Sequence, residues 1–281
     1  MQKITQKTLD SIFTFLQNEV SNRGFKQVVI GLSGGIDSAV VTLLCHKALC
    51  GNTKALLMPS TSSSKESIED SILLCESFKI DYAILPIKDF DSLFCNLYKD
   101  HTRLSRGNFC SRMRMATLYH IAQMEQRLVI GTSNKTEIML GYGTIFGDLA
   151  CAINPIGNLY KTQIYMLAEL LEIPRQIIDK APSADLYAGQ TDENELGYSY
   201  DEIDPFLESY EKAKGDITKL TQYSKDMTKS LHKRIQNNAF KQNMPMIFRD
   251  LEYWLSNKYM FNLQTDSIKL LDGIFRWFKT W

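Results

Sequence analysis

Apolar residues follow two alternating patterns along the chain, and these patterns predict its helices and strands. Residues 4–20 place apolar side chains three or four positions apart, which predicts a helix that ends near Gly24. Short continuous apolar runs predict buried parallel strands, and these runs cover residues 28–32, 55–58, 82–85 and 128–131. Further helices are predicted over residues 37–49 and 109–126. Another helix is predicted to follow a polar serine-rich loop (59–70) and to end near residue 78.

Strands that alternate with helices of about 10–15 residues are typical of a parallel sheet covered on both faces. The predicted fold class is therefore α/β, with a Rossmann-like parallel sheet and helices on both faces. We find no internal repeat and no linker, so residues 1–250 are predicted to form a single domain. Residues 251–281 hold all three tryptophans and an amphipathic segment. They are predicted to form an extra helical tail that packs on the core or on a second subunit, with a membrane-surface helix as the alternative.

Composition excludes some classes of partner. The 281 residues include 32 basic and 32 acidic side chains, and this balance argues against a nucleic-acid coat or a polybasic membrane anchor. The N-terminal residues lack the apolar core of a signal peptide, and no apolar run approaches the ~18 residues of a spanning helix. Six cysteines without a CxxC pair are typical of reduced thiols. We therefore expect a cytoplasmic protein that binds neither nucleic acid nor membrane.

The segment GLSGGIDSAVV (31–41) is the strongest local signal for chemistry, because it joins a predicted strand to a predicted helix. Gly34 and Gly35 let backbone N–H groups approach an anion closely, and the helix N-terminus adds a partial positive charge. Hydroxyl groups for phosphate oxygens are available on Ser33 and Ser38. The segment therefore predicts a phosphate-binding loop.

Asp37 in the same loop would repel a phosphate by itself, so we interpret it as a ligand of Mg²⁺ that bridges to the phosphate. The structural alternative is a glycine-serine turn that Asp37 caps. The chain contains neither a Walker A sequence nor a GxGxxG fingerprint, which excludes those two modes of nucleotide binding.

The sequence SGGIDS resembles the signature of the ATP pyrophosphatase (PP-loop) superfamily, whose members cleave ATP between the α and β phosphates. By itself this leaves GMP, asparagine and argininosuccinate synthetases and tRNA-modifying ligases open. Four further blocks narrow the choice, and these are GNFCSRMRM (107–115), GTSNKTE (131–137), NPIGNLYKTQ (154–163) and KAPSADL with GQTDENELGYSYDEID (180–186 and 189–204). With the loop, they make the chain resemble NAD synthetase from about residue 5 to residue 247.

The resemblance implies an adenine nucleotide alpha hydrolase-like fold and a ligase activity. It implies ATP-dependent amidation of deamido-NAD by free ammonia, which gives NAD, AMP and pyrophosphate through an acyl-adenylate. ATP is then a co-substrate and Mg²⁺ a cofactor. Adenylation gives a poorly electrophilic carboxylate a good leaving group, so catalysis would depend on positioning and electrostatics, in which Asp37 and Lys161 take part.

Residue roles follow from the match of each position to the motifs. The resemblance implies that ATP is bound by Gly31, Leu32, Ser33, Gly34, Gly35, Ile36, Asp37, Ser38, Thr132, Lys161 and Ser183. It implies Asp37 and Glu137 as the Mg²⁺ ligands, and Arg112 and Lys241 as contacts of deamido-NAD. Thr132 also follows a predicted strand, at the edge where parallel sheets bind ligands.

Three positions depart from the commoner family pattern. Ile145 stands where many members have a lysine, Ala152 where an acidic residue is usual, and Phe240 where a histidine often precedes the C-terminal lysine. All three fall on the dinucleotide side of the family pattern, so the predicted ATP and Mg²⁺ roles rest on a closer match than the deamido-NAD contacts.

Only about 25 residues precede the first predicted strand, which leaves no room for a nitrilase-type glutaminase domain. We therefore expect free ammonia as the nitrogen donor, unless a separate glutaminase subunit delivers it. The resemblance also implies a homodimer with the substrate site at the interface. The polar stretches 59–70 and 187–197 are predicted lids that exclude water from the acyl-adenylate.

Two other hypotheses remain. One is a different PP-loop amidotransferase or ligase that acts on a nucleotide or tRNA, although the neutral charge disfavours tRNA. The other is a non-catalytic nucleotide sensor on the same fold. The joint presence of Asp37, Glu137 and Lys161 favours catalysis.

Overall fold

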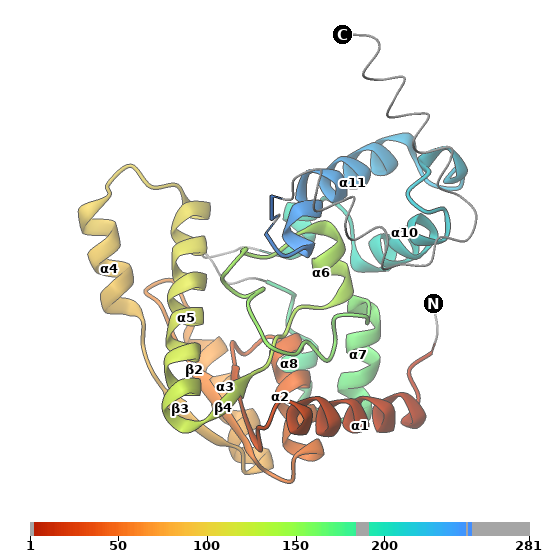
Figure 1. Ribbon diagram of the computed structural model, residues 1–281. Coiled ribbons are helices and arrows are strands. Elements are labelled where there is room, and N and C mark those ends of the chain that lie inside the picture. Colours follow the sequence, from red (N-terminus) through yellow and green to blue (C-terminus); the bar gives the residue numbers. More distant parts are fainter. Residues whose placement is uncertain (1–2, 184–190, 246, 249–281) are drawn as a thin grey trace. The chain divides into compact units, whose positions relative to one another are not determined.

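The computed structural model describes residues 3–183, 191–245 and 247–248 (Figure 1). The chain divides into two units, Met1–Gln242 and Asn243–Trp281. All the helices and strands below belong to the first unit. The tail predicted over residues 251–281 lies outside the described residues.

In the described part of the chain, the sheet has four parallel strands in the order β3-β2-β1-β4. These strands are β1 (Gln27–Gly31), β2 (Thr53–Leu57), β3 (Asp81–Ile84) and β4 (Arg127–Val129). Ile30 of β1 pairs with Ala55 of β2, and Val29 pairs with Val129 of β4. The central strand β1 is apolar throughout its middle, which a parallel strand buried on both faces requires.

Helices cover both faces of this sheet (Figure 1). Val28 and Ile30 point into a large apolar cluster, whereas Val29 between them points into a second cluster on the opposite face. The first cluster contains side chains of α1 (Gln6–Asn22), α2 (Ile36–Ala48), α3 (Lys65–Phe78), α7 (Lys161–Leu170) and α8 (Arg175–Ile178). The second contains side chains of α5 (Arg103–Glu125). The predicted α/β class, with helices on both faces, is confirmed.

A third apolar cluster belongs to a group of helices beyond the sheet. Its buried side chains include Phe206, Leu207 and Leu231. The elements of this group are α6 (Lys135–Leu140), α9 (Asp192–Leu196), α10 (Tyr200–Lys212), α11 (Lys225–Asn238) and the 3₁₀ turns η1 (Ile217–Lys219) and η2 (Ala239–Gln242). Because α6 follows shortly after β4, this cluster is fixed close to the carboxyl end of the sheet.

Polar caps move two helix boundaries from their predicted places. The N–H of Ser67 donates to Ser64 Oγ over 3.0 Å, so α3 starts at Lys65 and the serine-rich loop ends at residue 64 rather than 70. Thr102 caps α5 in the same way, so this helix starts six residues before the predicted residue 109. Helix α4 (Lys88–Leu97) was not predicted.

The cysteines and the helix lengths agree with what the composition predicts. All six cysteines lie among the described residues and carry free thiols. Within residues 3–183, 191–245 and 247–248, no helix has both the length and the apolar character that crossing a bilayer requires.

Candidate active site

A cavity of about 1290 Å³ lies at the carboxyl ends of β1, β2 and β4. The chain leaves β1 toward β2 and β3 on one side, while β4 lies on the other side, which makes this end a topological switch point where α/β sheets bind ligands. The predicted site residues that line the cavity are Gly31, Leu32, Ser33, Gly35, Ile36, Asp37, Ser38, Thr132, Glu137, Lys161, Ser183 and Lys241. Gly34 and Arg112 are not among its lining residues.

Gly34 has a packing role beneath the loop. Its φ angle is +82°, and a Cβ at this position would collide with the carbonyl oxygen of Ser67 in α3. Only glycine therefore lets the loop lie directly on the first turn of α3. The hydroxyl of Ser38 donates to the carbonyl oxygen of Gly35 over 2.9 Å and accepts from the N–H of Ser33 over 3.2 Å. These bonds give the loop a fixed shape.

The N-terminus of α2 is open toward the cavity. Gly35 is its N-cap and has no side chain to accept from the first turn, whose N–H groups have no partners within the helix. Backbone donors and the helix dipole thus point toward the space between the loop and β4. This arrangement is suited to an anion, which is what the glycine-rich sequence predicts to bind here.

A buried ion pair stands at the start of the same helix. The ammonium of Lys161, which is 2% exposed, contacts Oδ2 of Asp37, and the side-chain amide of Asn134 donates to Oδ1 of Asp37 over 2.9 Å. Burial alone would lower the pKa of Lys161, but the carboxylates of Asp37, Glu137 and Asp192 outweigh burial and raise it. Lys161 is therefore a permanent cation in the wall of the cavity.

Glu137 is held beside this pair by a capping box. Asn134 Oδ1 accepts from the N–H of Glu137 over 2.9 Å, and the N–H of Asn134 donates to Glu137 Oε2 over 3.0 Å. Asn134 thus connects both predicted Mg²⁺ ligands. Burial and the nearby charge of Asp37 raise the pKa of Glu137 well above its ordinary value.

Two carboxylates fit a Mg²⁺ ion that takes its other ligands from water and from substrate phosphates, which is how this ion commonly binds. Among the described residues, no group of three or more His, Cys, Asp or Glu side chains is placed to hold a metal. The residues present therefore fit a metal that arrives with a nucleotide.

Contacts between α6, α7 and α10 hold Lys161 in place. The N–H of Lys161 donates to Thr136 Oγ1 over 3.0 Å, and the N–H of Thr162 donates to Asp204 Oδ2 over 2.8 Å. Asp204 is completely buried and also accepts from the Thr136 hydroxyl. The helical cluster beyond the sheet thereby fixes the lysine at the cavity.

The two residues predicted to contact the dinucleotide, Arg112 and Lys241, do not lie together at the cavity as Asp37, Glu137 and Lys161 do. Lys241 lines the cavity and donates to the carbonyl oxygens of Gly141 and Gly143 over 2.8 and 3.0 Å. Arg112 is exposed on α5 and does not reach the cavity of its own chain. Ile145, Ala152 and Phe240 also do not line the cavity.

Several cavity residues were not predicted from the sequence, and these include Asn108, Ser111, Arg114, Asp148, Lys180 and Asp192. Most of them lie inside or next to the blocks that carried the family resemblance. Arg114 follows Arg112 by two positions, and residues two apart on a helix face different directions. Sequence reasoning selected the arginine that faces outward, and only helical geometry shows that Arg114 faces the cavity.

The chain is similar to known proteins over most of its length. The sequence model of the NAD synthase family matches residues 8–245. The chain belongs to the NAD synthase family. The NH(3)-dependent NAD(+) synthetase of Helicobacter acinonychis (strain Sheeba) is 52% identical over 253 residues, which cover 88% of this chain and 97% of the relative.

Solved structures in this family show the same fold. The NH3-dependent NAD synthetase from Campylobacter jejuni, in complex with the nitrate ion, has a TM-score of 0.76 at 41% identity and covers 87% of this chain and 99% of that chain. The NMN synthetase from Francisella tularensis has a TM-score of 0.79 at 34% identity and covers 87% of this chain and 98% of that chain. As a member of the NAD synthase family, this chain is a ligase that amidates deamido-NAD with ammonia and ATP.

Proposed function

We propose that the cavity activates the nicotinate carboxylate of deamido-NAD as an acyl-adenylate, which ammonia then converts to NAD. The observation that supports this proposal most directly is the convergence of loop 33–38, Asp37, Glu137 and Lys161 at one end of the cavity. These groups can neutralise a polyphosphate and hold it for displacement at the α-phosphorus.

In the first step, a carboxylate oxygen attacks the α-phosphorus of ATP, the bond to the bridging oxygen breaks, and pyrophosphate leaves. The N–H groups at the start of α2 and the ammonium of Lys161 would bind the departing phosphates. Because Lys161 is already charged, buried and fixed, little reorganisation is needed when negative charge develops.

In the second step, the nitrogen of ammonia attacks the acyl carbon, the bond to the AMP oxygen breaks, and the nitrogen loses one proton. Water would compete with ammonia for the acyl-adenylate, so the cavity must close. Pro59, Ser63 and Ser64 of segment 59–64 line the cavity, which agrees with a role as a lid. Asp192 and Glu195 of the predicted lid 187–197 also line it. Residues 187–190 of that second lid lie outside the described residues.

We place the Mg²⁺ ion, which comes with ATP, at Asp37 and Glu137. When bound, it supplies positive charge at the phosphates. Burial and the nearby charge of Asp37 raise the pKa of Glu137, and a bound cation would offset both effects, which supports this assignment.

A homodimer would explain where Arg112 acts. Helices α4 and α5 expose large apolar side chains, and these are Phe90, Leu93, Leu97, Leu104, Tyr119 and Met124. Arg112 lies exposed on the same helix α5. We propose that this surface binds a second copy of the chain, so that Arg112 reaches the dinucleotide in the cavity of the partner.

Amidation of the corresponding mononucleotide, nicotinic acid mononucleotide, is the second candidate function. The likeness to the NMN synthetase from Francisella tularensis favours it, together with the departures at Ile145, Ala152 and Phe240. Free thiols support a cytoplasmic location for this ligase, and balanced charge supports a protein that binds neither nucleic acid nor membrane. We also propose that it takes ammonia from solution.

One assay tests the function and its alternatives. Purified protein receives ATP, Mg²⁺, ammonium and either deamido-NAD or nicotinic acid mononucleotide, and NAD, NMN, AMP and pyrophosphate are measured. The proposal expects NAD, AMP and pyrophosphate in equal amounts, with deamido-NAD preferred. Bound ATP without product would support a nucleotide sensor, and preference for the mononucleotide would support the second candidate. Trapping with hydroxylamine in place of ammonia would detect the acyl-adenylate.

A further inference from the structure

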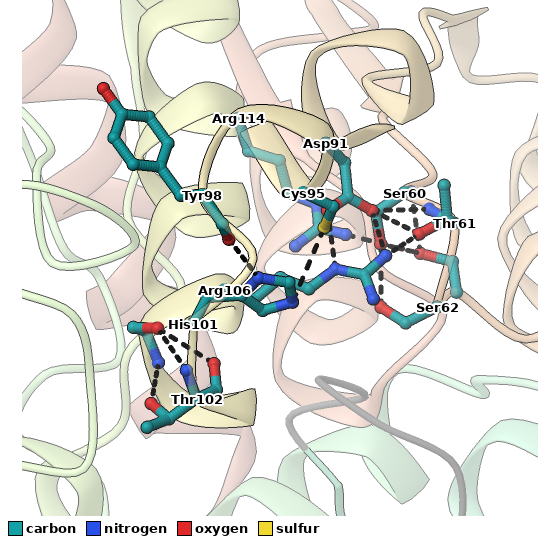
Figure 2. Close-up of polar contacts among 12 residues, drawn as sticks. Ser60, Thr61, Ser62, Asp91, Cys95, Tyr98, His101, Thr102, Arg106 and Arg114 are labelled. Atoms are coloured by element: carbon teal, nitrogen blue, oxygen red, sulfur yellow. Dashed lines mark hydrogen bonds and ion pairs between the residues drawn. The ribbon is translucent and has the colours of Figure 1, made fainter. Parts of the chain in front are cut away.

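Asp91 is a fully buried carboxylate outside the cavity, in a helix whose other residues are exposed or half-buried. It is the one buried residue that α4 contributes, while Phe90, Leu93 and Leu97 of the same helix are more than half exposed. A carboxylate is costly to bury unless cations and hydrogen bonds compensate it. The surroundings of Asp91 supply both (Figure 2).

Arg106 of α5 and Thr61 of the serine-rich loop converge on Asp91. Arg106 donates from Nε to Oδ1 over 2.7 Å and from Nη2 to Oδ2 over 2.8 Å, which is the two-pronged geometry of a strong pair. Thr61 donates to Oδ2 from its N–H over 3.2 Å and from its hydroxyl, and Arg106 also contacts that hydroxyl. The hydrogen bonds from Arg106 hold the pKa of Asp91 well below its usual range.

Thr61 connects this cluster to the cavity. Pro59, Ser63 and Ser64 line the cavity next to the end of β2, whereas Thr61, Asp91 and Arg106 do not. The N–H of Ser60 donates to Ser63 Oγ over 3.0 Å, and Arg114, a cavity residue, donates to the same oxygen over 3.3 Å. The shape of segment 59–64 therefore depends on Arg114 from inside the cavity and on Asp91 from outside it.

The thiol of Cys95 lies in the same cluster, 3.7 Å from Asp91 Oδ1 and 3.7 Å from Nε2 of His101. Burial raises the pKa of Cys95, so the thiol is protonated at neutral pH and lacks the thiolate of a nucleophile. The cluster has the features of a mechanical support and lacks those of a second reaction centre.

We propose that Asp91 and Arg106 are positioning residues that hold segment 59–64 in the shape that binds ATP. The proposal rests on the proposed function, because it assigns ATP to this cavity. It makes Thr61 the connection between the pair and the cavity wall. Loss of the pair should weaken ATP binding more than it slows the chemical steps, since neither residue reaches the reacting atoms.

The test uses the full chain and measures ATP–Mg²⁺ affinity by calorimetric titration without deamido-NAD, together with KM and kcat for NAD formation. Asp91→Asn keeps the size of the side chain and removes its charge. Arg106→Lys keeps the charge and loses the fork, while Arg106→Met loses both. Thr61→Val removes only the hydroxyl of an exposed residue, so this variant still reports if Asp91→Asn fails to fold.

Glu125→Gln is the matched control. Glu125 accepts from Lys54 Nζ over 2.6 Å and from Arg127 Nε over 2.7 Å, so it is also a carboxylate between basic groups. None of these three residues lines the cavity. A carboxylate that matters only for stability should change thermal unfolding without changing ATP affinity.

We expect Asp91→Asn to weaken ATP binding and raise its KM about tenfold, with kcat changed less than about threefold. Thr61→Val should weaken ATP binding about threefold, and Arg106→Lys should recover part of what Arg106→Met loses. The double variant Asp91→Asn/Thr61→Val should be no worse than Asp91→Asn, because both changes break one connection. Glu125→Gln should leave ATP affinity within about twofold of the original.

ATP affinity that is unchanged in folded Asp91→Asn, additive losses in the double variant, or an equal loss in Glu125→Gln would overturn the proposal. Failure of the proposed function has a different result. The unmodified protein would then bind ATP without forming NAD, and the titrations would still decide whether Asp91 acts on the nucleotide site.

Discussion

At one end of the cavity the functional side chains are held by contacts within the chain, whereas at the other end they face outward. At the end near loop 33–38, Asp37, Lys161 and Asn134 are bonded to one another, and Lys161 is almost completely buried. At the end formed by α5, Arg112 and large apolar side chains face outward. The first end has its final geometry in a single chain. The second is the surface that we propose binds a second copy of the chain.

The free-energy cost of burying a charge explains why the two ends differ. A buried charge is tolerated only with partners in place, and the partner that Lys161 contacts directly is Asp37, which precedes it by 124 residues. Exposed apolar side chains such as Leu97 carry no such requirement in the monomer, but they favour association. We infer that activation of ATP is a property of one chain and that recognition of the dinucleotide is a property of two.

The largest effect should come from removing the acid at the buried end. Asp37→Ala removes the proposed metal ligand and the partner of Lys161, so NAD formation should fall about a thousandfold. Lys161 still has Glu137 and Asp192 nearby, so the fold should survive, which circular dichroism would show. Asp81→Ala, at an exposed acid on β3, is the control and should retain activity. Near-normal turnover of Asp37→Ala would refute the metal assignment.

Acidic substitutions on the exposed apolar surface of α4 should lower activity by preventing dimer formation. The double variant Leu93→Asp/Leu97→Asp on α4 should give a monomer in sedimentation velocity and lower NAD formation about a hundredfold, while ATP affinity stays within about twofold. Leu170→Asp, at an exposed leucine of α7, is the matched control and should leave the dimer intact. A dimer that persists in the double variant would place the interface elsewhere.

Arg112→Ala should change KM for one substrate and not for the other. Loss of this guanidinium should raise KM for deamido-NAD about tenfold and leave KM for ATP unchanged, because Arg112 does not line the cavity of its own chain. Arg23→Ala removes an arginine from the end of α1 and should change neither constant. Steady-state kinetics with each substrate varied in turn would check both variants, and a rise in KM for ATP would contradict the assignment.

The smallest expected effect is a change in how the stability of the ligand-free protein depends on pH. The pKa of Glu137 is raised in the folded state, so the folded protein favours the protonated form, and stability falls as pH rises above the ordinary value of 4.5. Glu137→Gln should therefore gain stability relative to the original as pH rises, by an amount on the order of 1 kcal/mol. Urea unfolding at pH 4.5 and pH 7.5 would measure it. A gain that is equal at both pH values would contradict this cause.

Sequence patterns predicted most of the sheet and the loop correctly, because both depend on local signals. The apolar run of β1 and the glycines that follow it are contiguous, and α2 starts at Ile36, one residue before the predicted helix. Helix α4 was not predicted, and its burial is unusual: Phe90, Leu93 and Leu97 face solvent, whereas its buried residue, Asp91, is charged. No local pattern indicates that a carboxylate in an exposed helix is a core residue.

The sequence alone determined the α/β class, the glycine-rich loop between β1 and α2, and the family, since each follows from residue types at short, fixed spacings. Tertiary structure decided that Lys161 pairs with Asp37, that Arg114 rather than Arg112 faces the cavity, and that Asp91 supports Thr61 from outside. These contacts join segments that are far apart in the chain. Their formation depends on how the helices pack against the sheet, because only packing brings distant charges close enough to compensate one another after they leave water.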